Sequence, residues 1–94
     1  KHGLPVLTVI GNNARWNAVD WTSRLVYPDG AMTRQDWQSL SDLRPAPDYE
    51  KVVEASGGYG VVVSERAALE GALRKALAVV EEEGRQAVVN VICA

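Results

Sequence analysis

Cysteine and histidine are almost missing from this chain of 94 residues: Cys93 and His2 are single, and phenylalanine is absent. One cysteine excludes a disulfide within the chain and a metal site built from several cysteines. Because Cys93 ends an apolar run, we expect it to be buried as a small hydrophobic side chain. His2 stands beside the first residue, and we assign it no role.

A strong charge and a long apolar run are missing too. The formal net charge is -2, no apolar stretch approaches the ~20 residues that span a bilayer, and the first residues lack a signal-peptide pattern. We therefore expect no nucleic-acid partner and no membrane partner, and a cytoplasmic location. Hydrophobic residues make up 47%, as is ordinary for a globular protein, and a length of 94 residues suits a single domain over residues 1–94.

Three short apolar runs, rich in β-branched residues, predict buried strands of a parallel sheet. Segments of helical spacing with glycine or proline stops lie between them. This alternation predicts an α/β fold, a three-layer α/β/α arrangement with right-handed crossovers. The expected strands are Leu4–Ile10, Tyr59–Val63 and Ala87–Cys93, and the expected helices are about Trp16–Val26, Tyr49–Ser56 and Ser64–Gly84.

Finer expectations concern helix ends and packing. Asp48 and Ser64 are suited to cap helices, and Gly84 is suited to end one. Residues 31–47 predict an irregular segment with one short helix, and Trp21 is assigned to packing. The apolar anchors expected in 31–47 are Met32, Trp37, Leu40 and Leu43, and the buried face expected for the last helix is Leu69, Ala72, Leu73, Ala76, Leu77 and Val80.

Two consecutive amides, Asn12 and Asn13, follow the first apolar run. In an open parallel sheet, ligands bind at the carboxyl ends of the strands. An amide offers a neutral oxygen, which can ligate a hard cation such as Mg²⁺ where phosphates complete the coordination. The alternative is that both asparagines only shape a turn or cap the next helix.

The stretch "GLPVLTVIGNNARWNAV" resembles the end of the cofactor-binding signature of thiamine-diphosphate-dependent enzymes. The downstream "LRPAPDYEKVVEASGGYGVVV" and the closing "RQAVVNVICA" are similar to that family's continuation, nearest to its acetolactate synthase and benzoylformate decarboxylase-like group. The resemblance covers nearly the whole chain. It implies a partial thiamine-diphosphate-binding fold in which the last strand, Val88–Ile92, inserts between the other two.

The resemblance also implies site residues. Asn13 would ligate Mg²⁺ through its side-chain oxygen, and Arg15 would do so through its backbone carbonyl. Asn12 belongs to the same asparagine pair, and the segment after it would bring Trp16, Asn17 and Val19 beside the cofactor. For Trp16, plain core packing stays open as the alternative.

Two features of the family are missing. No Gly-Asp-Gly occurs in the chain, and the family's catalytic glutamate lies in a different domain of a neighbouring subunit. The chain therefore resembles the C-terminal half of a cofactor-binding domain, as a fragment or a truncated product. We expect no catalytic residue in it, no turnover of 2-oxo acids by the chain alone, and little or no binding of thiamine diphosphate and Mg²⁺. A parent enzyme would decarboxylate or ligate 2-oxo acids, as a lyase or a transferase.

Other readings make different predictions. A nucleotide-binding module needs a glycine-rich loop after a strand, but the only glycine cluster, Ser56–Gly60, precedes one. A non-catalytic domain that self-associates or binds a partner chain stays open as the second alternative.

The expected state of association follows from the strands. The run Leu4–Ile10 would lack its neighbouring strand, so we expect a homo-oligomer.

Overall fold

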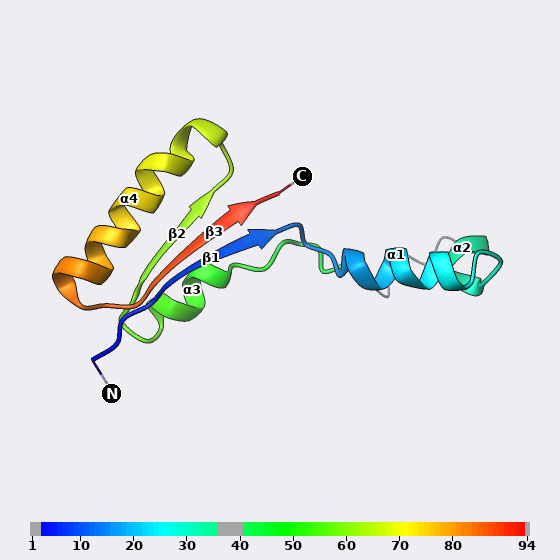
Figure 1. Ribbon diagram of the computed structural model, residues 1–94, viewed down its shortest axis with the longest axis horizontal. Helices are drawn as coiled ribbons and strands as arrows, with labels where there is room; N and C mark the ends of the chain where they lie inside the picture. Colours follow the sequence, from blue (N-terminus) through cyan, green and yellow to red (C-terminus); the bar gives the residue numbers. More distant parts are fainter. Residues whose placement is uncertain (1–2, 36–40, 94) are drawn as a thin grey trace. The chain divides into compact units, whose positions relative to one another are not determined.

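The computed structural model describes residues 3–35 and 41–93, and it divides the chain into two compact units. One unit contains the residues up to Asn13 and those from Asp48 onward; the other is Ala14–Pro47 (Figure 1). Each unit is described by itself. Three residues with sequence expectations, His2, Trp37 and Leu40, lie outside the described residues.

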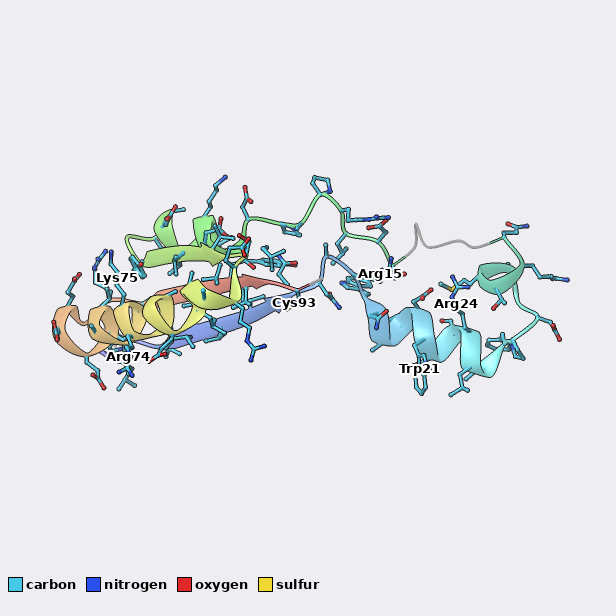
Figure 2. All side chains as sticks on the ribbon, turned by 90° about the horizontal axis from the view of Figure 1, so that it is seen from above. Arg15, Trp21, Arg24, Arg74, Lys75 and Cys93 are labelled. Carbon is cyan, nitrogen blue, oxygen red and sulfur yellow. The ribbon has the colours of Figure 1, made fainter. Side chains whose placement is uncertain are left out.

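The first unit is built on a parallel sheet with the strand order β1-β3-β2. Its strands are β1 (Leu7–Asn12), β2 (Tyr59–Val63) and β3 (Ala87–Ile92). Both neighbours of β3 are parallel to it, which confirms the expectation that the closing strand lies in the middle. Helices α3 (Tyr49–Glu54) and α4 (Arg66–Glu83) lie on opposite faces of the sheet (Figure 2), so the α/β prediction is confirmed.

The ends of two strands differ from the sequence prediction. β1 begins at Leu7 and continues through Gly11 to Asn12, because these last residues still pair with Val91 and Ile92 of β3. The first asparagine is therefore part of the strand. β3 ends one residue earlier than expected, so Cys93 lies beyond it and is exposed; the expectation of a buried cysteine was wrong.

The core lies between α4 and one face of the sheet. Ala76 and Val89 are fully buried there. Leu77 was expected in this face but is exposed, because one residue turns the chain by about 100° around a helix and Ala76 already faces the sheet. The N-cap residue of α4 is Glu65 instead of Ser64. Gly84 ends the helix with a left-handed φ of 64°, as predicted.

Helix α3 approaches the sheet very closely at one point. A Cβ atom at Gly60 would lie 2.4 Å from the backbone oxygen of Glu50. Only glycine leaves room for a helix backbone at this distance from a strand. Asp48 is the N-cap residue, as predicted, but its carboxylate pairs with Lys51 and does not cap the helix.

The second unit contains α1 (Asn17–Val26) and the short helix α2 (Ala31–Arg34), which agrees with the predicted helix and short helix. Asp20 of α1 is buried, and its carboxylate accepts a hydrogen bond from Arg24 at 3.1 Å. Trp21 is 64% exposed, so its assignment to packing was wrong for this chain. No helix among the described residues is long and apolar enough to cross a membrane.

Candidate functional site

The two asparagines at the end of β1 differ in their surroundings. Asn12 is 4% exposed and is the last residue of the strand, where its carbonyl accepts the N–H of Cys93 at 2.8 Å. Asn13 follows the strand and is exposed. Because the strand ends between them, Asn12 is part of the packed sheet and Asn13 is the amide presented to solvent at the carboxyl edge.

The chain turns sharply after Asn13. Ala14 has a left-handed φ of 50°, a conformation that is uncommon for a residue with a side chain and is often functional. Such a conformation is retained where neighbouring structure enforces it. Ala14 therefore stands as a turn residue between the exposed side chain of Asn13 and the backbone of Arg15.

An antiparallel bridge between Arg15 and Asp42 orients the backbone of the second unit. Two hydrogen bonds form it: Trp16 N–H donates to the Ser41 carbonyl at 2.7 Å, and Leu43 N–H donates to the Ala14 carbonyl at 2.8 Å. The peptide groups on both sides of Arg15 are thereby fixed. Neither of these two bonds uses the Arg15 carbonyl as its acceptor.

The partner strand of this bridge carries an ion pair. Asp42 accepts hydrogen bonds from the Arg44 side chain at 2.8 Å and from the Arg44 backbone N–H at 2.9 Å. These bonds, the side-chain one above all, lower the pKa of Asp42 from 3.8 to about 2. Asp42 also raises the pKa of Arg44 through the same hydrogen bond. Asp42 is therefore ionised and already neutralised by a neighbour.

No group of three or more histidine, cysteine, aspartate or glutamate side chains is arranged to hold a metal among residues 3–35 and 41–93. The donors near the end of β1 are neutral amide and carbonyl oxygens. Such oxygens suit a hard cation whose charge is balanced by a bound phosphate group. The chemistry of this donor set fits Mg²⁺ in the presence of a diphosphate.

The remaining residues expected beside a cofactor lie at the start of α1. Trp16 is the N-cap residue, and Asn17 and Val19 lie in the first turn. All three are exposed, so plain core packing does not account for Trp16 in this chain. About 200° of helical rotation separates Asn17 from Val19, so their side chains point to different sides of α1. Asn12 and Asn13 belong to the other unit.

Sequence reasoning missed a buried polar pair beneath α3. The side-chain N–H of Asn90 donates to the carboxyl of Glu50 at 2.7 Å, and both residues are buried. A signal was present, because an asparagine inside the apolar run "AVVNVIC" needs a buried partner. The sequence did not say which residue supplies it.

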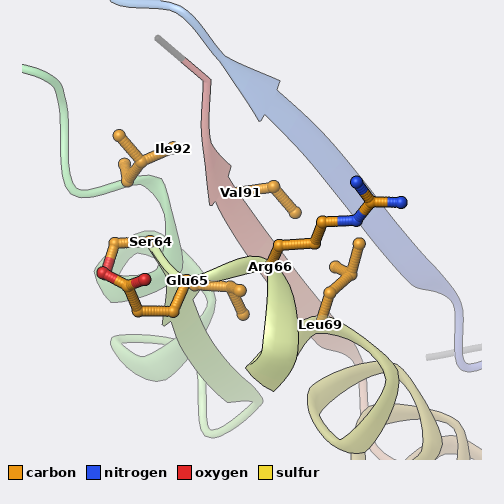
Figure 3. A pocket seen from close by; sticks show the side chains of 7 residues that line it. Ser64, Glu65, Arg66, Leu69, Val91 and Ile92 are labelled. Carbon is orange, nitrogen blue, oxygen red and sulfur yellow. The ribbon is translucent and has the colours of Figure 1, made fainter.

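Two hollows flank the sheet of the first unit. One, of about 240 Å³, lies at the carboxyl ends of β2 and β3 beside the start of α4, where Glu65 and Arg66 point in opposite directions (Figure 3). The other, of about 380 Å³, lies beside α3 and is mainly apolar. Its lining is Ile10, Tyr49, Val52, Val53, Ser56, Gln86 and Val88.

Comparison with known proteins agrees with these features. Residues 1–91 match a family described as thiamine pyrophosphate enzyme, C-terminal TPP binding domain. A "Probable acetolactate synthase" of Mycobacterium bovis is 36% identical over 92 residues, which are 98% of this chain and 15% of the relative. "Acetolactate synthase large subunit IlvG" of Mycobacterium tuberculosis has the same identity and coverage. The chain thus spans about 15% of the length of these relatives. No solved structure matches significantly.

Proposed function

We propose a function from one premise: the chain belongs to the thiamine pyrophosphate enzymes and matches their C-terminal, TPP-binding domain. On this premise, residues 1–94 are one functional domain that contributes one side of a Mg²⁺-diphosphate site. The enzyme acts on 2-oxo acids by decarboxylation or carboligation, and so is a lyase or a transferase. The observation that carries the proposal is the exposed amide of Asn13 directly after a buried strand end.

Asn13 and Arg15 are the proposed metal ligands. Asn13 would bind Mg²⁺ through its amide oxygen, and Arg15 through its backbone carbonyl. The fit is supported by the neutral donor set, by the left-handed turn at Ala14 and by the bridge that fixes the peptide groups around Arg15. The bridge orders the backbone around Arg15 alone, so less conformational entropy is lost on that side of the proposed site when the metal binds.

The other proposed contacts are with the cofactor. Asn12 supports Asn13 by keeping the end of β1 in the sheet. Trp16, Asn17 and Val19 would exclude water beside the cofactor. They are exposed in this chain. Asn17 and Val19 point to different sides of α1, so these two side chains would contact different parts of the cofactor. When bound, thiamine diphosphate supplies a stabilised carbanion for chemistry on 2-oxo acids.

Manganese provides a direct test, because Mn²⁺ replaces Mg²⁺ at oxygen sites and broadens nearby NMR signals. Because paramagnetic broadening detects even weak binding, which is all that we expect of this chain alone, Mn²⁺ with inorganic diphosphate should broaden the side-chain amide signals of Asn13 and the backbone N–H signals next to Arg15 first. Asn13→Ala should abolish this selective broadening. Asn13→Asp should retain it, because an oxygen ligand remains. The readout does not require turnover.

The acidic run Glu81–Glu83 is the internal control for nonspecific binding, since three carboxylates attract any divalent cation. If broadening were strongest at Glu81–Glu83, and if Asn13→Ala left the pattern unchanged, the proposed metal site would be wrong. The amide of Asn90 is buried and should change only at the highest Mn²⁺ concentration.

A second proposed property is assembly into a homo-oligomer, as a self-associating domain would show. Large apolar side chains are exposed in both units, among them Val9 on β1 and Trp21 and Leu25 on α1. Trp21 and Leu25 are four residues apart and lie on one side of α1, and contiguous apolar surface of this kind marks interaction sites. Sedimentation at micromolar concentration measures the assembly independently of cofactor binding, and a monomer at all concentrations would contradict it.

A further inference from the structure

The peptide group between Arg15 and Trp16 has a fixed direction. Its N–H, which belongs to Trp16, donates to the carbonyl of Ser41 at 2.7 Å. In a planar trans peptide group, the N–H and the C=O point to opposite sides. The carbonyl of Arg15 therefore points away from Ser41, and the hydrogen bond to Ser41 decides the direction in which this oxygen is presented.

The peptide group before Arg15 is held by the same segment. The N–H of Leu43 donates to the carbonyl of Ala14 at 2.8 Å. Ala14 has a left-handed φ of 50°, which is unfavourable for a residue with a Cβ atom and persists where the surrounding structure enforces it. Residues 41–43 thus supply two of the contacts that enforce this turn.

Residues 41–43 need an anchor of their own, because they form an isolated bridge outside the named strands. One anchor is burial, since Ser41 is 1% exposed. The other is the carboxylate of Asp42, which accepts the backbone N–H of Arg44 at 2.9 Å. A bond from an aspartate side chain to the N–H two residues later closes an Asx turn. This turn fixes the course of the chain directly after the bridge.

We propose that Asp42 is a positioning residue for the carbonyl of Arg15, the proposed metal ligand. The Asp42 side chain shapes residues 42–44, and this shape holds the segment 41–43 opposite residues 14–16. The two bridge bonds then orient the carbonyl of Arg15. The inference rests on the proposed Mg²⁺-diphosphate site and adds to it a residue that acts only through the backbone.

The role of Asp42 depends on its oxygen as an acceptor more than on its charge. The guanidinium of Arg44 also donates to Asp42, at 2.8 Å, but the Arg44 side chain is 65% exposed. Ion pairs at such exposed positions contribute little to stability. Asp42→Asn keeps an oxygen that can accept the backbone N–H, and Arg44→Gln keeps that N–H. Both variants should preserve the bridge, whereas Asp42→Ala should not.

Hydrogen exchange and paramagnetic broadening test the two successive steps. In Asp42→Ala, the N–H groups of Trp16 and Leu43 should exchange roughly tenfold faster, because the bridge opens more often. With Mn²⁺ and inorganic diphosphate, broadening of the N–H signals next to Arg15 should fall relative to broadening of the Asn13 side chain. Asp42→Asn should restore both readouts, which a loss of side-chain volume alone does not explain.

Asp48→Ala is the matched control. Asp48 is also an aspartate paired with a nearby cation, Lys51, but it lies outside the bridge, so its loss should change neither readout. Unchanged exchange at Trp16 and Leu43 in Asp42→Ala would overturn the positioning role. Faster exchange with an unchanged broadening ratio would overturn it as well, because the bridge would then be structural only.

Two further outcomes are distinguishable. If Asp42→Asn behaved like Asp42→Ala, the charge would be the cause and the Asx-turn mechanism would be wrong. If the unaltered chain showed no selective broadening at Asn13 or next to Arg15, the proposed metal site would fall, and with it the role of Asp42 toward the metal. Hydrogen exchange would still show whether Asp42 holds the bridge.

Discussion

The side-chain amide of Asn90 donates a hydrogen bond to the carboxyl of Glu50 across 2.7 Å, between residues 40 positions apart. Asn90 is 1% exposed and Glu50 is 7% exposed. The bond joins the middle strand to the first turn of α3. Helix α3 is the first element of the first unit after residues 14–47. The bond therefore holds the beginning of this helix against the middle strand.

Loss of the Asn90 amide should destabilise the fold. Asn90→Val keeps most of the volume but leaves the buried carboxyl of Glu50 without this donor, which should cost about 2–3 kcal/mol. The double variant Glu50→Leu with Asn90→Val should recover part of that loss, because both polar groups are then gone. Urea unfolding followed by far-UV circular dichroism, at one fixed protein concentration, measures the difference. Losses that simply add would show that the two side chains are not coupled.

Gly60 should tolerate no side chain. Gly60→Ala brings a Cβ atom to 2.4 Å from the backbone oxygen of Glu50, and relief requires α3 to move, at a cost of about 1–3 kcal/mol. Gly71→Ala is the control within α4, where nothing lies within 4 Å of the added atom. It should stabilise the protein by roughly 0.5–1 kcal/mol through helix propensity. Similar melting temperatures for both variants would contradict the close approach of α3.

The Asp42–Arg44 pair predicts a pH dependence in the second unit. The Arg44 hydrogen bonds lower the pKa of Asp42 from 3.8 to about 2, so the folded state binds this proton less readily than the unfolded state. The stabilisation is complete above pH 3.8 and is lost as the pH falls towards 2. Arg44→Gln should return the pKa of Asp42 towards 3.8. Carboxyl ¹³C chemical shifts report the titration, and an unchanged midpoint in the variant would exclude Arg44 as the cause.

Asn13 and Leu73 should separate binding from stability. Asn13 is exposed, so Asn13→Ala should change the free energy of unfolding by no more than about 0.5 kcal/mol while removing selective Mn²⁺ broadening. Leu73 packs against the core, and Leu73→Ala should cost roughly 2 kcal/mol and leave the broadening intact. Thermal unfolding of both variants is the comparison. Equal losses of stability would argue against a ligand role for Asn13.

Local sequence determined the elements of this protein. The run "YGVVV" became a strand with the predicted ends, Tyr59–Val63, and Gly84 ended α4 in the left-handed conformation that glycine adopts most easily. Strand type and helix ends depend on neighbouring residues, so a single sequence contains the information. The central place of β3 followed from a family resemblance, because periodicity alone does not order strands in a sheet.

Only the tertiary structure decided which side chains are buried and which polar groups meet. The position of Asn90 in an apolar run indicated that its side chain needs a hydrogen-bond partner. That this partner is Glu50 depends on the packing of α3 against the sheet. Leu77, Trp21 and Cys93 look apolar in sequence and are exposed, because burial depends on what covers a residue and not on its own hydrophobicity. The division between Asn12 inside the strand and Asn13 outside it has the same origin: pairing with Ile92 extends β1 by residues that the apolar pattern alone does not include.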